Sequence, residues 1–226
     1  MYRMNHILVK KVLVALSLVF TTMLFHSAWA AANTSSASAK SDPQQLIQAV
    51  SSQLLKRVSA APKKSAPADF YFKLVEEIVA PYVDFDLIAK RVMARAYVSA
   101  SAEQRQNFTK TFRNTLLNTY SKAIANYGDQ KIVMLPFSGV QSQGLRERAT
   151  VKMQINAKTG EVIPITYALY KNDQGLWKLE NIIINGVNLG LTFRNQFQEA
   201  LRDNQGDLNK ATMSWQQMAS SNGSSK

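Results

Sequence analysis

The side chains that most often carry out chemistry in proteins are scarce in this sequence. The chain has no cysteine, and its two histidines, His6 and His26, both lie in the first thirty residues. Histidine is the commonest general base and metal ligand, and cysteine is a common nucleophile. If the first thirty residues are removed on export, as argued below, the remaining chain has neither imidazole nor thiol, and no disulfide can support its fold.

Two pairs of carboxylates remain as candidates for acid and base chemistry. Glu76 and Glu77 are adjacent on an expected helix, so they point in different directions, which is a poor geometry for a paired acid and base. Asp84 and Asp86 lie at an expected helix start, where capping explains them better than metal binding does. The sequence has no glycine-rich phosphate loop, nucleophile elbow or metal-ligand spacing. We therefore predict that the protein is not an enzyme and uses no metal or cofactor.

The first thirty residues have the pattern of a secretory signal peptide. Three basic residues precede an apolar stretch over residues 12–25, and Ala28 and Ala30 supply the small residues that a signal peptidase reads. Fourteen helical residues span about 21 Å, which is short of a hydrocarbon core of about 30 Å and argues against an uncleaved anchor. We expect a signal peptide over residues 1–30, cleaved after Ala30.

Basic residues outnumber acidic ones in the exported chain as well. The full sequence has 27 Lys and Arg against 15 Asp and Glu, a net charge of +12, and removing the three basic residues of the signal leaves 24 against 15, or +9. A basic surface suits nucleic acid, anionic lipid or an acidic protein, and charge alone does not choose among them. Export argues against nucleic acid. Small polar residues predict a disordered leader over 31–43 and a disordered tail over 219–226.

The stretch from Arg148 to Ile184 alternates apolar and polar residues with the two-residue period of β-strands. Tight-turn residues at 157–160 and 172–175 join three such strands into an antiparallel meander. The alternation breaks near Glu180 and Asn181, which predicts a bulge. A further strand over 131–137 brings the sheet to about four strands. The residues expected on its inner face are Val151, Met153, Ile155, Ile163, Ile165, Tyr167, Leu169, Trp177 and Leu179.

Amphipathic stripes with capping residues predict helices before and after this sheet. Asp69, Asp84 and Asp207 are placed to cap three of them, and Ser101 opens the longest, of about 26 residues, with a capping box. The other expected helices cover 44–58 and 189–201. Together the patterns indicate an α+β domain over 44–218, with a helical shell on a curved antiparallel sheet. Helices packed on a sheet either form a solid core or enclose a hollow cavity, and the stripes alone favour the solid core.

A family resemblance favours the hollow. The spacing in the long helix, the segment from Pro81 to Phe85, and the end of the last strand resemble the MlaC family, also called the toluene-tolerance family. The residues that carry the resemblance are Phe108, Phe112, Arg113, Leu116, Tyr120, Ala123, Ile124 and Tyr127, Pro81 to Phe85, Ser101 to Arg105, Trp177 to Asn181 and Gly186 to Leu189. Asn181 stands where an aspartate is common in the family, and Asn188 stands where a serine is common.

The resemblance implies a periplasmic phospholipid carrier with an NTF2-like sheet and an apolar cavity, in which phospholipid is cargo rather than cofactor. It also implies two partners, an inner-membrane complex of an MCE-domain ring with an ABC transporter and an outer-membrane lipoprotein–porin complex, and a role in maintaining outer-membrane lipid asymmetry. The alternative is a cell-envelope adaptor or binding protein with a solid core and no lipid. The expected lining of the cavity is Phe85, Ile88, Val92, Phe112, Leu116, Tyr120, Val151, Met153, Ile163, Ile165, Tyr167, Leu169, Trp177 and Leu179.

Overall fold

The computed structural model describes residues 42–61, 66–67, 69–124, 130–144, 146–157 and 160–222. The chain divides into two compact units, Met1–Asp42 and Pro43–Lys226, and the second holds nearly all the described residues. The predicted signal peptide lies outside the described residues, as do most of the predicted leader and the last four residues of the predicted tail.

Six of the helices described in this unit lie where their stripes predict, whereas the short η1 and α5 were not predicted. Their bounds are α2 (Pro43–Ser59), α3 (Phe70–Ile78), the 3₁₀ turn η1 (Ala80–Tyr82), α4 (Phe85–Met93), the short α5 (Ala96–Ser99), α6 (Ala102–Ile124), α7 (Leu189–Asp203) and α8 (Leu208–Asn222). The helix α8 extends four residues beyond the predicted domain end at 218, so the first part of the predicted tail is helical. The predicted end of the longest helix, at Gly128, lies outside the described residues.

Side-chain caps set several of these helix starts. The amide of Leu87 donates to Oδ1 of Asp84 at 2.9 Å, and the amide of Lys210 donates to Oδ1 of Asp207 at 3.1 Å. Ser101 forms the predicted capping box with Gln104, with hydrogen bonds of 2.9 and 3.1 Å in the two directions. Asp69 differs from the prediction. It occupies the N-cap position of α3 but makes no capping hydrogen bond, because its carboxylate is paired with Lys73 at 2.5 Å.

The sheet has six antiparallel strands, two more than predicted. They are β1 (Lys131–Met134), β2 (Val140–Gln143), β3 (Arg146–Asn156), β4 (Val162–Lys171), β5 (Trp177–Ile184) and β6 (Val187–Asn188), in the order β1-β3-β4-β5-β6 with β2 also paired to β3. The strand β2 has a single apolar residue in its sequence Val-Gln-Ser-Gln, so no alternation marks it. The strand β6 has only two residues, which is too short for any periodic signal.

The predicted bulge in the last long strand is present. Ala168 pairs with Asn181, whereas the next residue of β4, Leu169, pairs with Leu179. Glu180 is therefore the extra residue on β5. The consequence is a change of phase along the strand: Trp177 and Leu179 face inward before the bulge, and Ile182 and Ile184 face inward after it.

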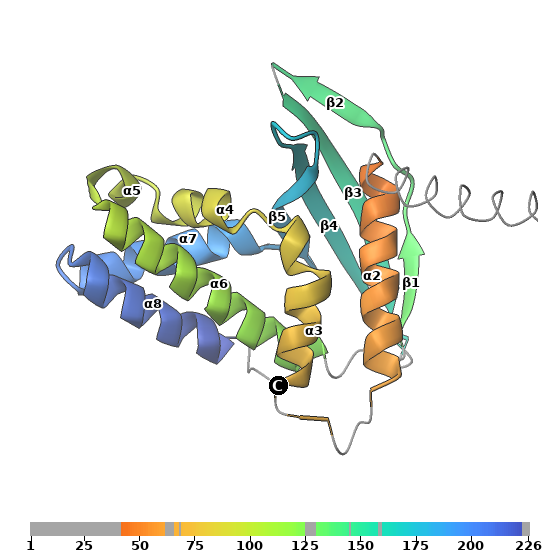
Figure 1. Ribbon diagram of the computed structural model, residues 1–226, viewed down its shortest axis with the longest axis horizontal. Coiled ribbons are helices and arrows are strands. Elements are labelled where there is room, and N and C mark those ends of the chain that lie inside the picture. Colours follow the sequence, from red (N-terminus) through yellow and green to blue (C-terminus); the bar gives the residue numbers. More distant parts are fainter. Residues whose placement is uncertain are drawn as a thin grey trace, which may run out of the picture. The chain divides into compact units, whose positions relative to one another are not determined.

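The helices form two groups, one packed on a face of the sheet and one beside the sheet (Figure 1). The helix α2 crosses the sheet and contacts β1 and β3, and α3 lies between α2 and α6. The helices α4, α6, α7 and α8 contact one another and form a separate bundle, to the left of the sheet in Figure 1. The buried apolar residues form separate clusters accordingly, one inside the bundle, one on the inner face of the sheet and a smaller one between α2 and α3.

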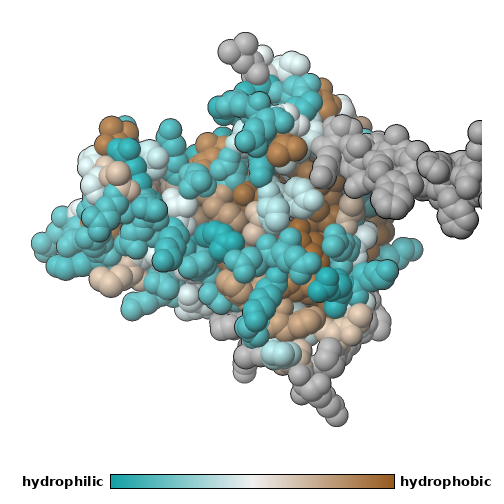
Figure 2. All heavy atoms as spheres, in the orientation of Figure 1, coloured by the Kyte–Doolittle hydropathy of each residue, from teal (hydrophilic) through white to brown (hydrophobic). Residues whose placement is uncertain are grey.

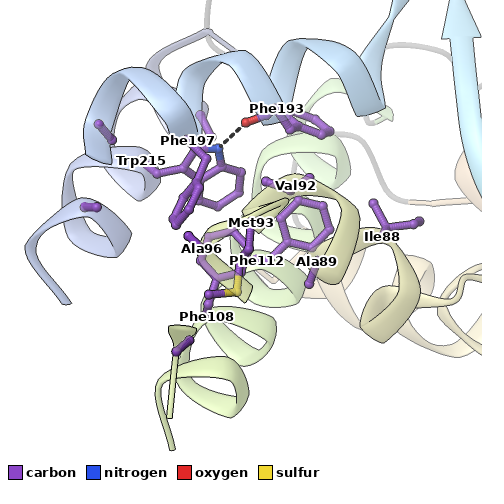
Figure 3. Close-up of a cluster of buried hydrophobic side chains, with 14 residues drawn as sticks. Ile88, Ala89, Val92, Met93, Ala96, Phe108, Phe112, Phe193, Phe197 and Trp215 are labelled. Carbon is purple, nitrogen blue, oxygen red and sulfur yellow. Dashed lines mark hydrogen bonds between the residues drawn. The ribbon is translucent and has the colours of Figure 1, made fainter. Parts of the chain in front are cut away.

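Aromatic side chains fill the interior of the bundle (Figure 3). The rings of Phe108 and Phe112, from α6, lie 5.5 and 5.2 Å from the ring of Trp215 on α8. Phe193 and Phe197, from α7, pack on the same two phenylalanines at 5.8 and 4.6 Å. The indole Nε1 of Trp215 donates to the carbonyl oxygen of Phe193 at 3.2 Å, so the buried polar atom has a partner. The bundle therefore has a solid core of its own.

Candidate functional site

The inner face of the sheet is a continuous apolar surface. The register places Met153, Ile165 and Ile184 in one row, and Val151, Tyr167 and Ile182 in the next. All eight sheet residues that the sequence predicts for the site belong to this one cluster. Five of them are buried, namely Val151, Met153, Ile165, Leu169 and Trp177, and three keep part of their surface accessible, namely Ile163, Tyr167 and Leu179.

The six helical residues predicted for the site lie in the other large cluster, inside or against the helical bundle. Ile88, Val92 and Phe112 are buried there, and Phe85, Leu116 and Tyr120 are partly buried against it. No cluster of buried residues among those that the structure describes contains both the helical and the sheet residues. The structure thus divides the predicted set into two groups, one on the inner face of the sheet and one in or against the helical bundle. Val92 and Phe112 have almost no accessible surface left for a ligand.

Tyr167 lies where α2 crosses the inner face. Burial raises the pKa of its phenol to about 12, and its hydroxyl shares a hydrogen bond with Ser51 of α2, although the side chain keeps some accessible surface. Ser51 also approaches the sulfur of Met153 on β3, at 3.7 Å. The phenol is thus desolvated by the helix that packs on this part of the sheet.

Tyr120 on α6 has the same combination. Burial raises the pKa of its phenol to about 12, the side chain is only partly buried, and its hydroxyl has no hydrogen-bond partner among the described residues. Leu116 lies one turn earlier on α6 and is also partly buried. Figure 2 shows hydrophobic side chains gathered between the helices and the sheet at the centre of the visible face, with hydrophilic ones around them. Both the inner face of the sheet and the bundle side of α6 thus carry partly accessible apolar residues.

Polar contacts join the start of α4 to the sheet. The hydroxyl of Tyr170 on β4 donates to Oδ2 of Asp84, and the amide of Asp84 donates to the carbonyl oxygen of Leu179 at 3.1 Å. Burial and the Asp84 carboxylate raise the pKa of Tyr170 to about 12. The bulge residue Glu180 pairs with Arg91 of α4 at 2.7 Å. These bonds fix α4 against β4 and β5, on the segment that the sequence marks by its family resemblance.

Sequence reasoning missed part of the inner face. Ile182 and Ile184 belong to the sheet cluster, as do Ile132 and Met134 of β1 and Tyr82 of η1. The run of three isoleucines at 182–184 breaks the alternation, so its facing could not be assigned without the position of the bulge. Combining the predicted bulge with the period of two would have placed Ile182 and Ile184 inward.

The described residues were also compared with the requirements of a metal site, a membrane span and an enclosed pocket. Among the described residues, no group of three His, Cys, Asp or Glu side chains could hold a metal ion. None of the helices in this described part is long and apolar enough to span a membrane. Two pockets, of about 610 and 520 Å³, lie along the helices, and neither is lined by the inner-face residues of the sheet. The enclosed apolar cavity therefore stays a prediction.

Comparisons with known proteins agree with this architecture. The family model of the MlaC protein matches residues 48–217. The chain is 35% identical over 176 residues to the toluene tolerance protein ttg2D of Pseudomonas putida, covering 76% of this chain and 79% of that protein. It is 28% identical over 189 residues to the intermembrane phospholipid transport system binding protein MlaC of Haemophilus influenzae, covering 82% and 83%.

A solved structure has the same fold. The phospholipid-binding protein from Ralstonia solanacearum, determined in complex with a phospholipid, superposes with a TM-score of 0.70 at 24% sequence identity, covering 81% of this chain and 99% of that one. The likeness confirms the predicted fold class, in which helices pack on an antiparallel sheet.

The fold defines a class of protein, an α+β protein with helices packed on an antiparallel sheet whose inner face is apolar. The match over residues 48–217 and the 35% identity to a relative then show that the chain belongs to the MlaC family, as its sequence resemblance predicts. This is a family of non-enzymatic lipid-binding carriers, which confirms the prediction that the protein is not an enzyme.

Proposed function

We propose that this protein is a periplasmic phospholipid carrier that moves lipid between inner- and outer-membrane complexes. Two observations support the proposal: membership of the MlaC family, and the partly accessible apolar residues on the inner face of the sheet and on the helices. Relatives that bind or transport phospholipid, from Haemophilus influenzae and Ralstonia solanacearum, add to it.

The acyl chains would lie between the inner face of the sheet and the accessible side chains of the helical layer. On the sheet this wall is formed by the eight predicted residues with Ile182 and Ile184 added. On the helical side Phe85, Leu116 and Tyr120 have surface to offer, whereas Ile88, Val92 and Phe112 support them from behind. The lining has no charged side chain among these residues, so it would select for hydrocarbon rather than for a head group.

Such a site suits transport because it would stabilise acyl chains about as strongly as a membrane does. Two acyl chains contain about 30 methylenes, each worth about 0.8 kcal/mol when removed from water, or on the order of 20 kcal/mol in total. A bilayer provides nearly the same stabilisation. Transfer between membrane and carrier is then close to neutral, and neither loading nor release needs a covalent step.

The proposed location and partners follow from the same family. The signal peptide over residues 1–30 would be cleaved after Ala30 and deliver the protein to the periplasm. There it would meet an inner-membrane MCE-domain and ABC transporter complex and an outer-membrane lipoprotein–porin complex. The name of the Haemophilus influenzae relative, an intermembrane phospholipid transport system binding protein, supports membership of such a system.

Native mass spectrometry of protein purified from the periplasm tests the proposal. We expect the wild-type protein to carry diacyl phospholipid, and Leu116→Arg on the partly buried face of α6 to lose it while keeping the wild-type circular dichroism spectrum. The matched control is Met213→Arg, at a position that is 58% exposed on α8, which should keep the lipid. A wild-type protein that is always empty would instead support the adaptor with a solid core.

A further inference from the structure

A groove on the outside of the helical bundle is distinct from the proposed lipid site. It has a volume of about 610 Å³, and its lining residues come mainly from α4, α5, β5 and the start of α7, which Figure 1 labels. Its floor includes the junction of β5 with α7, formed by Asn181, Asn188 and Gly190. Ile88 and Val92 also line it, but they are only 9% and 1% exposed, so little of their surface is available there.

The charge of the groove is positive. Its lining includes Arg91, Arg95 and Arg194 and a single acidic residue, Glu180. The carboxylate of Glu180 is already paired with Arg91 at 2.7 Å and lies 3.5 Å from Nε of Arg148. Arg95 and Arg194, in contrast, are exposed, and neither has an acidic partner within the part of the chain that the structure describes. Two guanidinium groups are thus available to a ligand.

Exposed apolar side chains lie beside these arginines. Val98 on α5 is 81% exposed and Leu191 on α7 is 54% exposed, and both line the groove. Protein interfaces usually have apolar anchor residues at the centre and a charged rim. The groove has the same make-up, because aliphatic side chains lie in a concave site next to unpaired guanidinium groups. The concave form argues against a bilayer surface, which is too flat to enter a groove.

We propose that this groove docks an acidic segment with apolar anchor residues, contributed by a protein partner at one of the two membranes. The partner's carboxylates would pair with Arg95 and Arg194, and its apolar side chains would cover Val98 and Leu191. This inference rests on the proposed carrier function, because a carrier must be recognised by its donor and acceptor. The docking groove and the lipid wall share no exposed residue, so a partner could hold the protein without covering the acyl chains.

Surface plasmon resonance tests the proposal. It measures binding of the lipid-loaded wild-type protein to the purified periplasmic domain of the MCE-domain protein from the same organism. For Arg95→Glu/Arg194→Glu we expect association about 10-fold slower or more at low salt, with the difference shrinking at about 0.5 M NaCl. The control Lys131→Glu/Arg202→Glu makes the same change of net charge at exposed positions outside the groove and should associate within about twofold of wild type.

A second pair of variants tests the apolar anchors. Val98→Ser/Leu191→Ser should dissociate several-fold faster without a change in salt dependence, whereas Met213→Ser, on exposed surface outside the groove, should not. The same measurements are made with the purified outer-membrane lipoprotein complex. Wild-type association with both groove variants, or no binding of the wild type to either partner, would overturn the docking proposal.

Lipid content separates this proposal from the carrier function. The groove variants should keep their phospholipid in native mass spectrometry, and loss of lipid together with partner binding would instead assign the groove to the lipid site. Flotation with vesicles of phosphatidylethanolamine and phosphatidylglycerol covers the remaining possibility. If Arg95→Glu/Arg194→Glu reduces binding to these vesicles only, the arginines bind a membrane surface and the proposal of a protein partner is wrong. An empty wild-type protein that still binds the MCE domain through Arg95 and Arg194 would contradict the carrier function alone.

Discussion

The carboxamide of Asn181, at the end of the bulge in β5, donates a hydrogen bond to Oδ1 of Asn188 at 3.0 Å. The same Oδ1 accepts the amide of Leu191 at 3.0 Å and so caps α7, while Oδ1 of Asn181 accepts the amide of Gly190 at 3.1 Å. These are the two positions that the sequence analysis marks as departures from the family resemblance. The structure shows that the two departures form one contact between the sheet and α7.

The pairing predicts that the two positions are energetically coupled. Asn181→Asp removes the donor and places a carboxylate against Oδ1 of Asn188, so we expect a loss of about 1–3 kcal/mol in the free energy of unfolding. Asn181→Asp/Asn188→Ser restores a donor, because the serine hydroxyl can donate to the carboxylate while its oxygen caps the amide of Leu191. Urea unfolding of the two single variants and the double variant should give a favourable coupling of about 0.5–3 kcal/mol. Additive effects would show that the two residues are independent.

Gly190 is expected to be intolerant of any side chain, because the carboxamide of Asn181 lies against it in the same contact. A Cβ atom at this position would lie 2.7 Å from Oδ1 of Asn181, which is held by its hydrogen bond to the amide of Gly190 itself. Gly190→Ala should therefore destabilise the protein by about 1–3 kcal/mol in urea unfolding, because the junction must shift to admit the methyl group. In the background of Asn181→Ala, which removes the clashing atom, the additional cost of Gly190→Ala should be smaller. An equal cost in both backgrounds would exclude this clash as the cause.

Local patterns in the sequence account for most of the elements of the fold. The capping box at Ser101 and the bulge at Glu180 are short-range signals, since each depends on residues that are neighbours along the chain. The pairing of β2 and the contact of Asn181 with Asn188 depend on which segments meet in space, and no periodicity reports that. The candidate site shows the same difference between local and long-range signals. The alternation correctly predicted which sheet residues face inward. A helical stripe cannot show whether that side of the helix faces a neighbouring helix or a recess.

Phe112 and Leu116, one turn apart on α6, test that distinction directly. Phe112 is buried among the aromatic rings of the bundle, whereas Leu116 is partly accessible. Phe112→Leu should cost about 1–2 kcal/mol of stability, a fraction of the 3–5 kcal/mol typical of Phe→Ala in a core, and should leave the amount of bound phospholipid unchanged. Leu116→Asn should reduce the bound phospholipid measured by mass spectrometry while costing less stability. Equal lipid loss in both variants would place Phe112 in the site as well.

Alkaline pH should destabilise the protein through its desolvated tyrosines. The pKa values of Tyr120 and Tyr167 are raised to about 12 from an ordinary value of 10, because burial disfavours the phenolate. The folded state therefore binds these protons more tightly than the unfolded state does. The resulting stabilisation is fully present below pH 10 and is lost as the pH rises through 12, by up to about 2 kcal/mol for each tyrosine.

Tyr120→Phe is the informative variant, because the hydroxyl that it removes has no hydrogen-bond partner within the described residues. At pH 8 its free energy of unfolding should equal that of the wild type within about 0.5 kcal/mol, since no hydrogen bond within the described residues is lost with the hydroxyl. Urea unfolding between pH 10 and 12 should then show a shallower decline for the variant, because one titrating phenol is gone. Parallel pH profiles for the wild type and Tyr120→Phe would mean that Tyr120 is hydrated in the folded protein, and the recess on that side of α6 would then be open to water.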